Sequence, residues 1–221
     1  MDDPAGKHEP AQPARTFGQG AAPAAPFAGA DRAGAPAPAQ RAICVFCGAK
    51  TGDGPHWSAL AREVGRRIAQ AGWSVVFGGG RVGLMGALAD GALEAGGEVI
   101  GVIPQRLVLA EVAHAGCSRL EVVPDMASRK PRMIALSDAF VALPGGLGTL
   151  DELFEVLTLA QLAWHDKPTV LIDAQDFWAG LLRWGEHAVA RGFVHRADWQ
   201  RLAVARSIDE AVGLLNDAFV R

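Results

Sequence analysis

The strongest candidate for a chemically active site is the segment P-G-G-L-G-T at 144–149, which Glu152 and Glu155 follow. Its three glycines are Gly145, Gly146 and Gly148. Glycine lets the backbone curl closely around a ligand, and the free N–H groups at the start of a helix favour an anion such as phosphate. Thr149 and Glu152 have the spacing of a capping box, so we expect a helix to begin at about Thr149. The segment therefore predicts an anion site with Glu152 and Glu155 on one helix face beside it.

A second glycine-rich turn, G-G-G-R-V-G-L-M-G at 78–86, follows another apolar run. Gly78, Gly80 and Gly83 match the dinucleotide pattern G-x-G-x-x-G, which normally follows the first strand of its fold. Here the turn follows the second expected strand, and Glu98, the acid about 20 residues on, begins its strand instead of ending it. We therefore expect a ligand loop, with a dinucleotide-dependent oxidoreductase kept as an alternative.

The segment at 126–133 carries three cations in four residues: Arg129, Lys130 and Arg132. It is expected to precede the helix that leads into a strand at 139–143. An arginine can bind phosphate oxygens through two parallel hydrogen bonds, whereas a lysine adds a compact charge. We expect Arg129 and Lys130 to reach the site and Arg132 to be a solvated surface cation.

These motifs need a scaffold, and short apolar runs that alternate with amphipathic stretches provide one. The expected strands are at 42–46, 74–77, 98–103, 120–123, 139–143 and 169–172. The expected helices lie around 60–68 and 84–92 and at 149–163, 177–190 and 207–219. Continuous apolar runs are typical of parallel strands covered by helices on both faces. The order predicts an α/β fold, a Rossmann-like doubly wound parallel sheet flanked by helices, with both glycine-rich turns at its ligand-binding edge.

Composition limits both the organisation of the chain and its partners. Residues 1–40 are rich in Ala, Pro and Gly and show no helical or strand periodicity, so we expect a disordered tail before a single nucleotide-binding domain at 41–221. The net charge of −3 provides no field that would attract nucleic acid. No apolar run predicts a membrane span, and no signal peptide is apparent. Three cysteines do not suggest a disulfide framework, so we expect a reduced, cytoplasmic setting.

Three ordered motifs together resemble a known family: P-G-G-x-G-T-x-x-E at 144–152, R-K at 129–130 and G-G-G-x-V-G-L-M-G at 78–86. They are similar to the LONELY GUY family of cytokinin riboside 5′-monophosphate phosphoribohydrolases, many relatives of which were labelled lysine decarboxylase. The resemblance spans roughly residues 41–215. It implies a Rossmann-like fold, a homodimer and hydrolysis of a nucleoside 5′-monophosphate to free base and ribose 5-phosphate. No cofactor or metal is expected.

The resemblance also implies a set of site residues. Its catalytic arginine and glutamate fall on Arg129 and Glu152. The expected substrate-binding residues are Gly79, Gly80, Glu111, Lys130, Gly145, Gly146, Leu147, Gly148, Thr149, Glu155 and Thr158. This chain departs from the family pattern at Ala127, where a histidine is common, and at Pro131 and Arg132.

Cleavage of a C1′–N bond builds positive charge on the ribose, and a carboxylate beside C1′ can stabilise it and deprotonate water. Glu152 is expected to do so, assisted by Glu155, while Arg129 binds the phosphate, a ribose hydroxyl or the departing base. A non-catalytic carrier of a nucleotide or of molybdenum cofactor is the alternative function. Decarboxylation would need pyridoxal phosphate on a lysine, and the core lysines Lys50, Lys130 and Lys167 have no recognisable cofactor setting.

Overall fold

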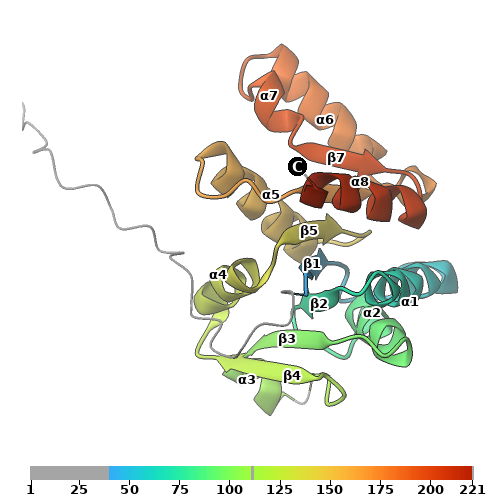
Figure 1. Cartoon of the computed structure of the whole chain (residues 1–221). Coiled ribbons are helices and arrows are strands. Elements are labelled where there is room, and N and C mark those ends of the chain that lie inside the picture. Colours follow the sequence, from blue (N-terminus) through green and yellow to red (C-terminus); the bar gives the residue numbers. More distant parts are fainter. Residues whose placement is uncertain (1–39, 111, 221) are drawn as a thin grey trace, which may run out of the picture.

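The computed structural model describes residues 40–110 and 112–220 and contains one parallel sheet (Figure 1). Its strands are β1 (Ala42–Phe46), β2 (Ser74–Phe77), β3 (Val99–Pro104), β4 (Arg119–Val123), β5 (Ala139–Ala142), β6 (Thr169–Ile172) and β7 (Leu202–Ala205). Their order across the sheet is β4-β3-β2-β1-β5-β6-β7, and every neighbouring pair is parallel. The expected doubly wound, Rossmann-like fold is confirmed. The expected tail at 1–40 lies almost wholly outside the described residues.

Helices cover both faces of the sheet. They are α1 (Pro55–Gln70), α2 (Gly83–Glu94), α3 (Gln105–Leu109), α4 (Met126–Leu136), α5 (Leu147–Gln161), α6 (Ala179–Ala190), α7 (Arg196–Trp199) and α8 (Ile208–Val220), with a short 3₁₀ turn at Ala174–Asp176. Figure 1 shows α1 and α2 on one side of the strands and α4 and α5 on the other. Among the described residues, no helix is both long and apolar enough to cross a membrane.

The side chains of β1 show how the strands fill two cores. Ile43 and Val45 pack into the core beneath α1, α2 and α8, whereas Cys44 and Phe46 pack into the core beneath α4 and α5. Successive side chains of a strand point to opposite faces, so a strand buried on both faces reads as an unbroken apolar run. This is why the apolar runs of the sequence identify the central strands correctly.

Helices α1 and α2 contact each other backbone to backbone through two glycines. A Cβ added at Gly65 would lie 2.0 Å from the carbonyl oxygen of Leu88, and one added at Gly91 would lie 2.0 Å from that of Arg62. Any side chain at either position would push the helices apart. The pair therefore forms a close-packed unit on which the glycine-rich turn before α2 is held.

Three local predictions need correction. The strand β7 was not expected, because its run L-A-V-A is short and rich in small residues. Helix α5 begins at Leu147, after Gly146 as N-cap without a side-chain cap, so Thr149 lies buried inside the first turn and does not cap the helix. The basic segment lies within α4 instead of before it, because Asp125 caps that helix by accepting a hydrogen bond from Ser128 N at 2.8 Å.

The order of the strands creates a crevice at the carboxyl edge of the sheet. From β1 the chain builds outward to β4 on one side, returns to β5 beside β1, and then builds outward to β7. The loops after β1 and β5 therefore lead to opposite faces, and ligands of open α/β sheets bind at such a switch point. A hydrogen bond from Gly48 N to Pro144 O, 3.2 Å long, joins the two loops at this point.

Candidate active site

A cavity of about 760 Å³ opens at this switch point. Its walls come from the carboxyl end of β3, from the segments that follow β1, β2, β3, β5 and β6, and from the first two turns of α4 and α5. All of these segments lie at the carboxyl ends of the strands, where the sequence predicted the ligand site. The cavity brings Arg129, Glu152 and the 144–149 loop together.

Arg129 reaches the cavity from α4 and is fixed by two backbone carbonyl groups. Its Nε donates to Val102 O at 3.1 Å, and its Nη2 donates to Gly78 O at 2.5 Å. A Cβ added at Gly78 would lie 1.8 Å from Nη2, so only glycine leaves room for the guanidinium. Burial lowers the pKa of Arg129, while the nearby charge of Glu152 opposes that effect. The first glycine of the 78–86 turn thus serves to place an arginine.

Glu152 points into the cavity from the second turn of α5, and among the described lining residues it is the only carboxylate. Burial raises the pKa of Glu152 to about 7, and the negative charges of Asp151 and Glu155 add to this rise. Arg129 and Lys130 act in the opposite direction. A carboxyl group with a pKa near 7 can both hold and release a proton at neutral pH, as general acid–base catalysis requires.

The 144–149 loop presents free backbone donors to the cavity. The N–H groups of Leu147, Gly148 and Thr149 occupy the first turn of α5, where a helix offers no acceptor of its own. A Cβ added at Gly146 or Gly148 would meet no atom within 4 Å, so both positions leave space for a ligand. Donors arranged in this way can bind an anion, which is what the sequence predicts for this loop.

Gly145 has a different role from its neighbours. A Cβ added there would lie 2.1 Å from Thr149 Oγ1 and 3.0 Å from Gly48 N. Gly145 therefore permits the loop after β5 to pack against Thr149 and against the loop after β1.

Of the remaining predicted residues, Gly80 lines the cavity, but Gly79, Lys130, Glu155 and Thr158 do not. Gly79 has a φ of +72° and packs against Ile103. Lys130 and Glu155 form an ion pair with each other, and Thr158 is exposed farther along α5. Glu111 lies outside the described residues, next to Val112, which does line the cavity.

Sequence reasoning missed Lys50, Trp57 and Phe177, which line the cavity from the segments after β1 and β6. Trp57 donates through Nε1 to Asp53 Oδ1 at 2.8 Å, and its ring meets that of Phe177 edge-on at 5.6 Å. Within the described parts of the chain, Lys50 has no hydrogen-bond or ion-pair partner. The position of Lys50 directly after the first strand was the signal that could have identified it.

Another wall of the cavity is apolar. It consists of Leu84, Met85, Ile103, Leu107 and Val112. These side chains come from α2, β3, α3 and the loop after α3. The cavity thus combines a polar end at α5 with an apolar end near β3.

The structure also bears on the predicted alternatives and departures. Glu98 lies at the amino end of β3, where it accepts a hydrogen bond from Ser74 Oγ at 3.0 Å, so it is at the edge opposite the cavity. Arg132 is not a free surface cation, because its Nε binds Glu121 at 2.5 Å. Neither it nor Ala127 or Pro131 lines the cavity. In the described part of the chain no cluster of three or more His, Cys, Asp or Glu side chains could hold a metal ion.

The fold is shared with solved structures of cofactor-binding proteins. The molybdenum cofactor carrier protein of Chlamydomonas reinhardtii superposes with a TM-score of 0.63 at 25% identity, over 82% of this chain and 99% of that one. The molybdenum cofactor binding protein of Rippkaea orientalis gives a TM-score of 0.64 at 24% identity, over 83% and 99% of the two chains.

The relatives found by sequence have a higher identity to this chain than these structures do, and the two described here share the same enzyme name. A cytokinin riboside 5′-monophosphate phosphoribohydrolase of Rhodococcoides fascians is 45% identical over 179 residues, 80% of this chain and 90% of the relative. One of Arabidopsis thaliana is 40% identical over 175 residues, 79% of this chain and 82% of the relative. Residues 85–215 also match a family model described as possible lysine decarboxylase. The chain therefore belongs to the cytokinin riboside 5′-monophosphate phosphoribohydrolases, the LONELY GUY family that its motifs resemble.

Proposed function

We propose that this protein is an enzyme that hydrolyses the N-glycosidic bond of a nucleoside 5′-monophosphate, releasing free base and ribose 5-phosphate. The observation that carries this proposal is the meeting of Arg129 and Glu152 with the 144–149 loop in one cavity. The phosphoribohydrolase relatives support the same reaction.

The two ends of the cavity suggest how the substrate lies. The 5′-phosphate binds the N–H groups of Leu147, Gly148 and Thr149, and Lys50 supplies a positive charge nearby. The base extends toward the apolar wall near Ile103. Strands lie about 4.8 Å apart, so the ends of β5 and β3, three strand spacings apart in the sheet order, are separated by roughly 14 Å. This span suits a nucleotide stretched across the strand ends.

In this orientation Glu152 faces the ribose. As the C1′–N bond breaks, its electron pair leaves with the base and positive charge develops at C1′. The Glu152 carboxylate stabilises that charge and accepts a proton from the water molecule whose oxygen bonds to C1′. Glu152 passes this proton on to the departing base and returns to its carboxylate form, so one water is consumed for each bond broken. Arg129, held by Gly78 O and Val102 O, is positioned to bind a ribose hydroxyl or the departing base.

The apolar wall favours a base that carries a hydrocarbon substituent. An N6-prenylated adenine would bury its side chain against Leu84, Met85 and Leu107, at about 25 cal/mol per Å² of apolar surface removed from water. Adenosine monophosphate fits the same polar contacts without that gain. We infer that a cytokinin riboside 5′-monophosphate is the preferred substrate and that adenosine monophosphate is accepted.

The test is an assay of purified protein with adenosine monophosphate and isopentenyladenosine monophosphate, with free base measured by chromatography. We expect wild-type protein to release base from both, with higher kcat/KM for the prenylated substrate. Glu152→Gln should lose at least about 100-fold in kcat, because its amide cannot take the proton from water.

Glu186→Gln is the matched control, because Glu186 pairs with Arg196 at the surface, remote from the cavity. It should keep wild-type activity. If wild-type protein binds nucleotide without releasing base, the carrier function is correct and the hydrolase proposal fails.

Three further features are part of the proposal. The family resemblance implies a homodimer. The low, odd number of cysteines supports a reducing, cytoplasmic compartment. The net charge of −3 argues against nucleic acid as a partner, and neither a nucleic acid nor a membrane is needed for the proposed reaction.

A further inference from the structure

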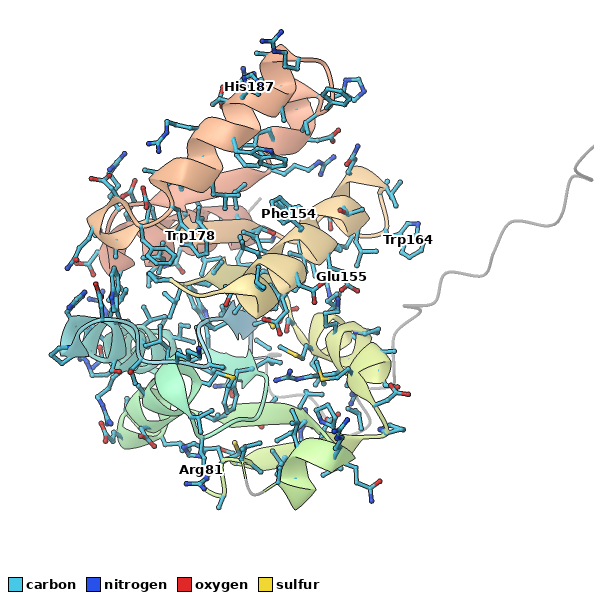
Figure 2. The ribbon with its side chains drawn as sticks, turned by 180° about the vertical axis from the view of Figure 1, so that it is seen from behind. Arg81, Phe154, Glu155, Trp164, Trp178 and His187 are labelled. Atoms are coloured by element: carbon cyan, nitrogen blue, oxygen red, sulfur yellow. The ribbon has the colours of Figure 1, made fainter. Side chains whose placement is uncertain are left out.

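Lys130 joins helix α4 to helix α5 through two carboxylates. Its Nζ lies 3.1 Å from Asp151 Oδ1 and 3.0 Å from Asp151 Oδ2, and it also pairs with Glu155. Figure 2 shows Glu155 on the side of α5 that faces α4. We call these three residues the Lys130 clamp. Arg129 and Glu152, the two catalytic candidates, are the chain neighbours of Lys130 and Asp151.

The Lys130 clamp lies outside the main cavity, and two of its three residues lie beside Glu152 between α4 and α5. Lys130 and Glu155 are absent from the wall of the main cavity, and together with Glu152 they line a separate crevice of negligible volume between α4 and α5. The Lys130 side chain is only 24% exposed, and its ammonium group is already occupied by two carboxylates. Lys130 is therefore poorly placed to bind a substrate phosphate.

Glu152 is surrounded by charges from both helices. Arg129 and Lys130 of α4 favour its ionised form, whereas Asp151 and Glu155 of α5 oppose it. From β1 and the segment after it, the thiols of Cys44 and Cys47 also interact with Glu152, but burial raises their pKa and keeps them neutral, and Lys50 lines the main cavity. Lys130 thus offsets the two carboxylates that flank Glu152 along α5.

We propose that Lys130 is a positioning residue that acts through Asp151 and Glu155, holding α4 against α5 and keeping Glu152 in its carboxylate form. This inference rests on the proposed function, in which ionised Glu152 is the active form. It assigns Lys130 and Glu155 to the support of the catalytic carboxylate instead of to substrate binding.

The test compares pH profiles of kcat for Lys130→Met and Glu155→Gln, since both variants remove the same ion pair. Lys130→Met leaves two carboxylates uncompensated, so the acidic limb should move to higher pH, with roughly threefold lower kcat at pH 6 and near-equal kcat at pH 9. Glu155→Gln removes one opposing charge, so its acidic limb should move to lower pH. Lys130→Arg keeps the positive charge, so its pH profile of kcat should equal that of wild type.

Loosened packing between α4 and α5 would change the pH profiles of both variants in the same direction. It therefore cannot explain shifts of the acidic limb in opposite directions. Parallel shifts, or a raised KM for nucleotide in Lys130→Met with an unmoved profile, would overturn the inference. Titration of the Glu152 carboxyl carbon by NMR provides a readout without turnover, with the same opposite shifts expected and unmoved titrations contradicting them. If wild-type protein releases no base, the proposed function fails, while the NMR titration still decides whether the clamp controls Glu152.

Discussion

The surroundings of Glu152 disfavour the ionised form of its carboxyl group. Burial raises the pKa of Glu152 to about 7, from 4.5 for a glutamate in water. Between these two pH values the folded protein binds a proton that the unfolded chain does not bind. Stability must therefore fall as pH rises through this window, and the full cost is present above about pH 7.

This cost leads to a prediction for Glu152→Gln, whose amide stays neutral at every pH. We expect the variant to be more stable than wild type by on the order of 1–3 kcal/mol at pH 8, with the difference vanishing near pH 4. Urea unfolding at both pH values would measure it. A variant that is less stable than wild type at pH 8 would show that Glu152 is stabilised by its surroundings instead.

Sequence reasoning placed some of the predicted residues correctly at the cavity and misplaced others. The cause is that it does not show in which direction a helical side chain points. Arg129 and Glu152 were identified because they belong to the motifs R-K and P-G-G-x-G-T-x-x-E, which resemble those of a known family. Lys130 follows Arg129 on α4 and Glu155 lies one turn after Glu152 on α5, but their side chains pair with each other and do not line the cavity. Chain neighbours on a helix point about 100° apart, so a linear motif does not show which members face the ligand.

At the scale of elements, the glycine-rich turns face the cavity and also make room for the side chains and backbone that pack against them. Gly78 leaves space for the Arg129 guanidinium, and Gly145 leaves space for Thr149 and Gly48. The site therefore depends on the close fit between a turn and the helix that faces it. Such a fit involves residues far apart in the chain, and this is why the individual role of each glycine could not be predicted.

The Gly78→Ala variant tests this fit. Its methyl group would collide with Arg129 Nη2 and displace the guanidinium from Gly78 O and Val102 O. We expect a loss of about 100-fold in kcat/KM, as a displacement of about 1 Å at a catalytic group can cause. Steady-state kinetics with the preferred nucleotide would measure the loss.

Gly180→Ala is the matched control, because a Cβ added at Gly180 on α6 meets no atom within 4 Å. Its activity should equal that of wild type. Equal activity in Gly78→Ala as well would mean that the position of Arg129 does not matter for turnover.

At the scale of the whole molecule, the fold class and the sheet edge at which the cavity opens could be predicted from the sequence. Continuous apolar strands and alternating helices were sufficient for a doubly wound sheet, because both features follow from burial on two faces. The sequence did not predict strand β7, because its run L-A-V-A is short and rich in small residues. The apolar wall could not be predicted, since its members are drawn from α2, β3 and α3 and meet only in the folded chain.

The predicted boundary at residue 40 can be tested by deletion. Ala42 N donates to Asp138 Oδ2 at 2.8 Å, Arg41 O accepts from Ser74 N at 2.8 Å, and the Arg41 guanidinium lies 4.7 Å from the Phe219 ring centroid. A chain that starts at Gln40 keeps all three contacts. We expect it to match the full chain in melting temperature, in kcat/KM and in the oligomeric mass measured by sedimentation. A lower kcat/KM would assign residues 1–39 a part in the site.

The contact between Arg41 and Phe219 also has a practical consequence. It places the start of the first strand and the last helix side by side at the amino ends of the strands, whereas the cavity opens at the carboxyl ends. A tag, fusion partner or surface tether attached through Gln40 or the last turn of α8 would therefore extend from the face opposite the cavity. The immobilised protein would keep its substrate entrance turned toward the solution.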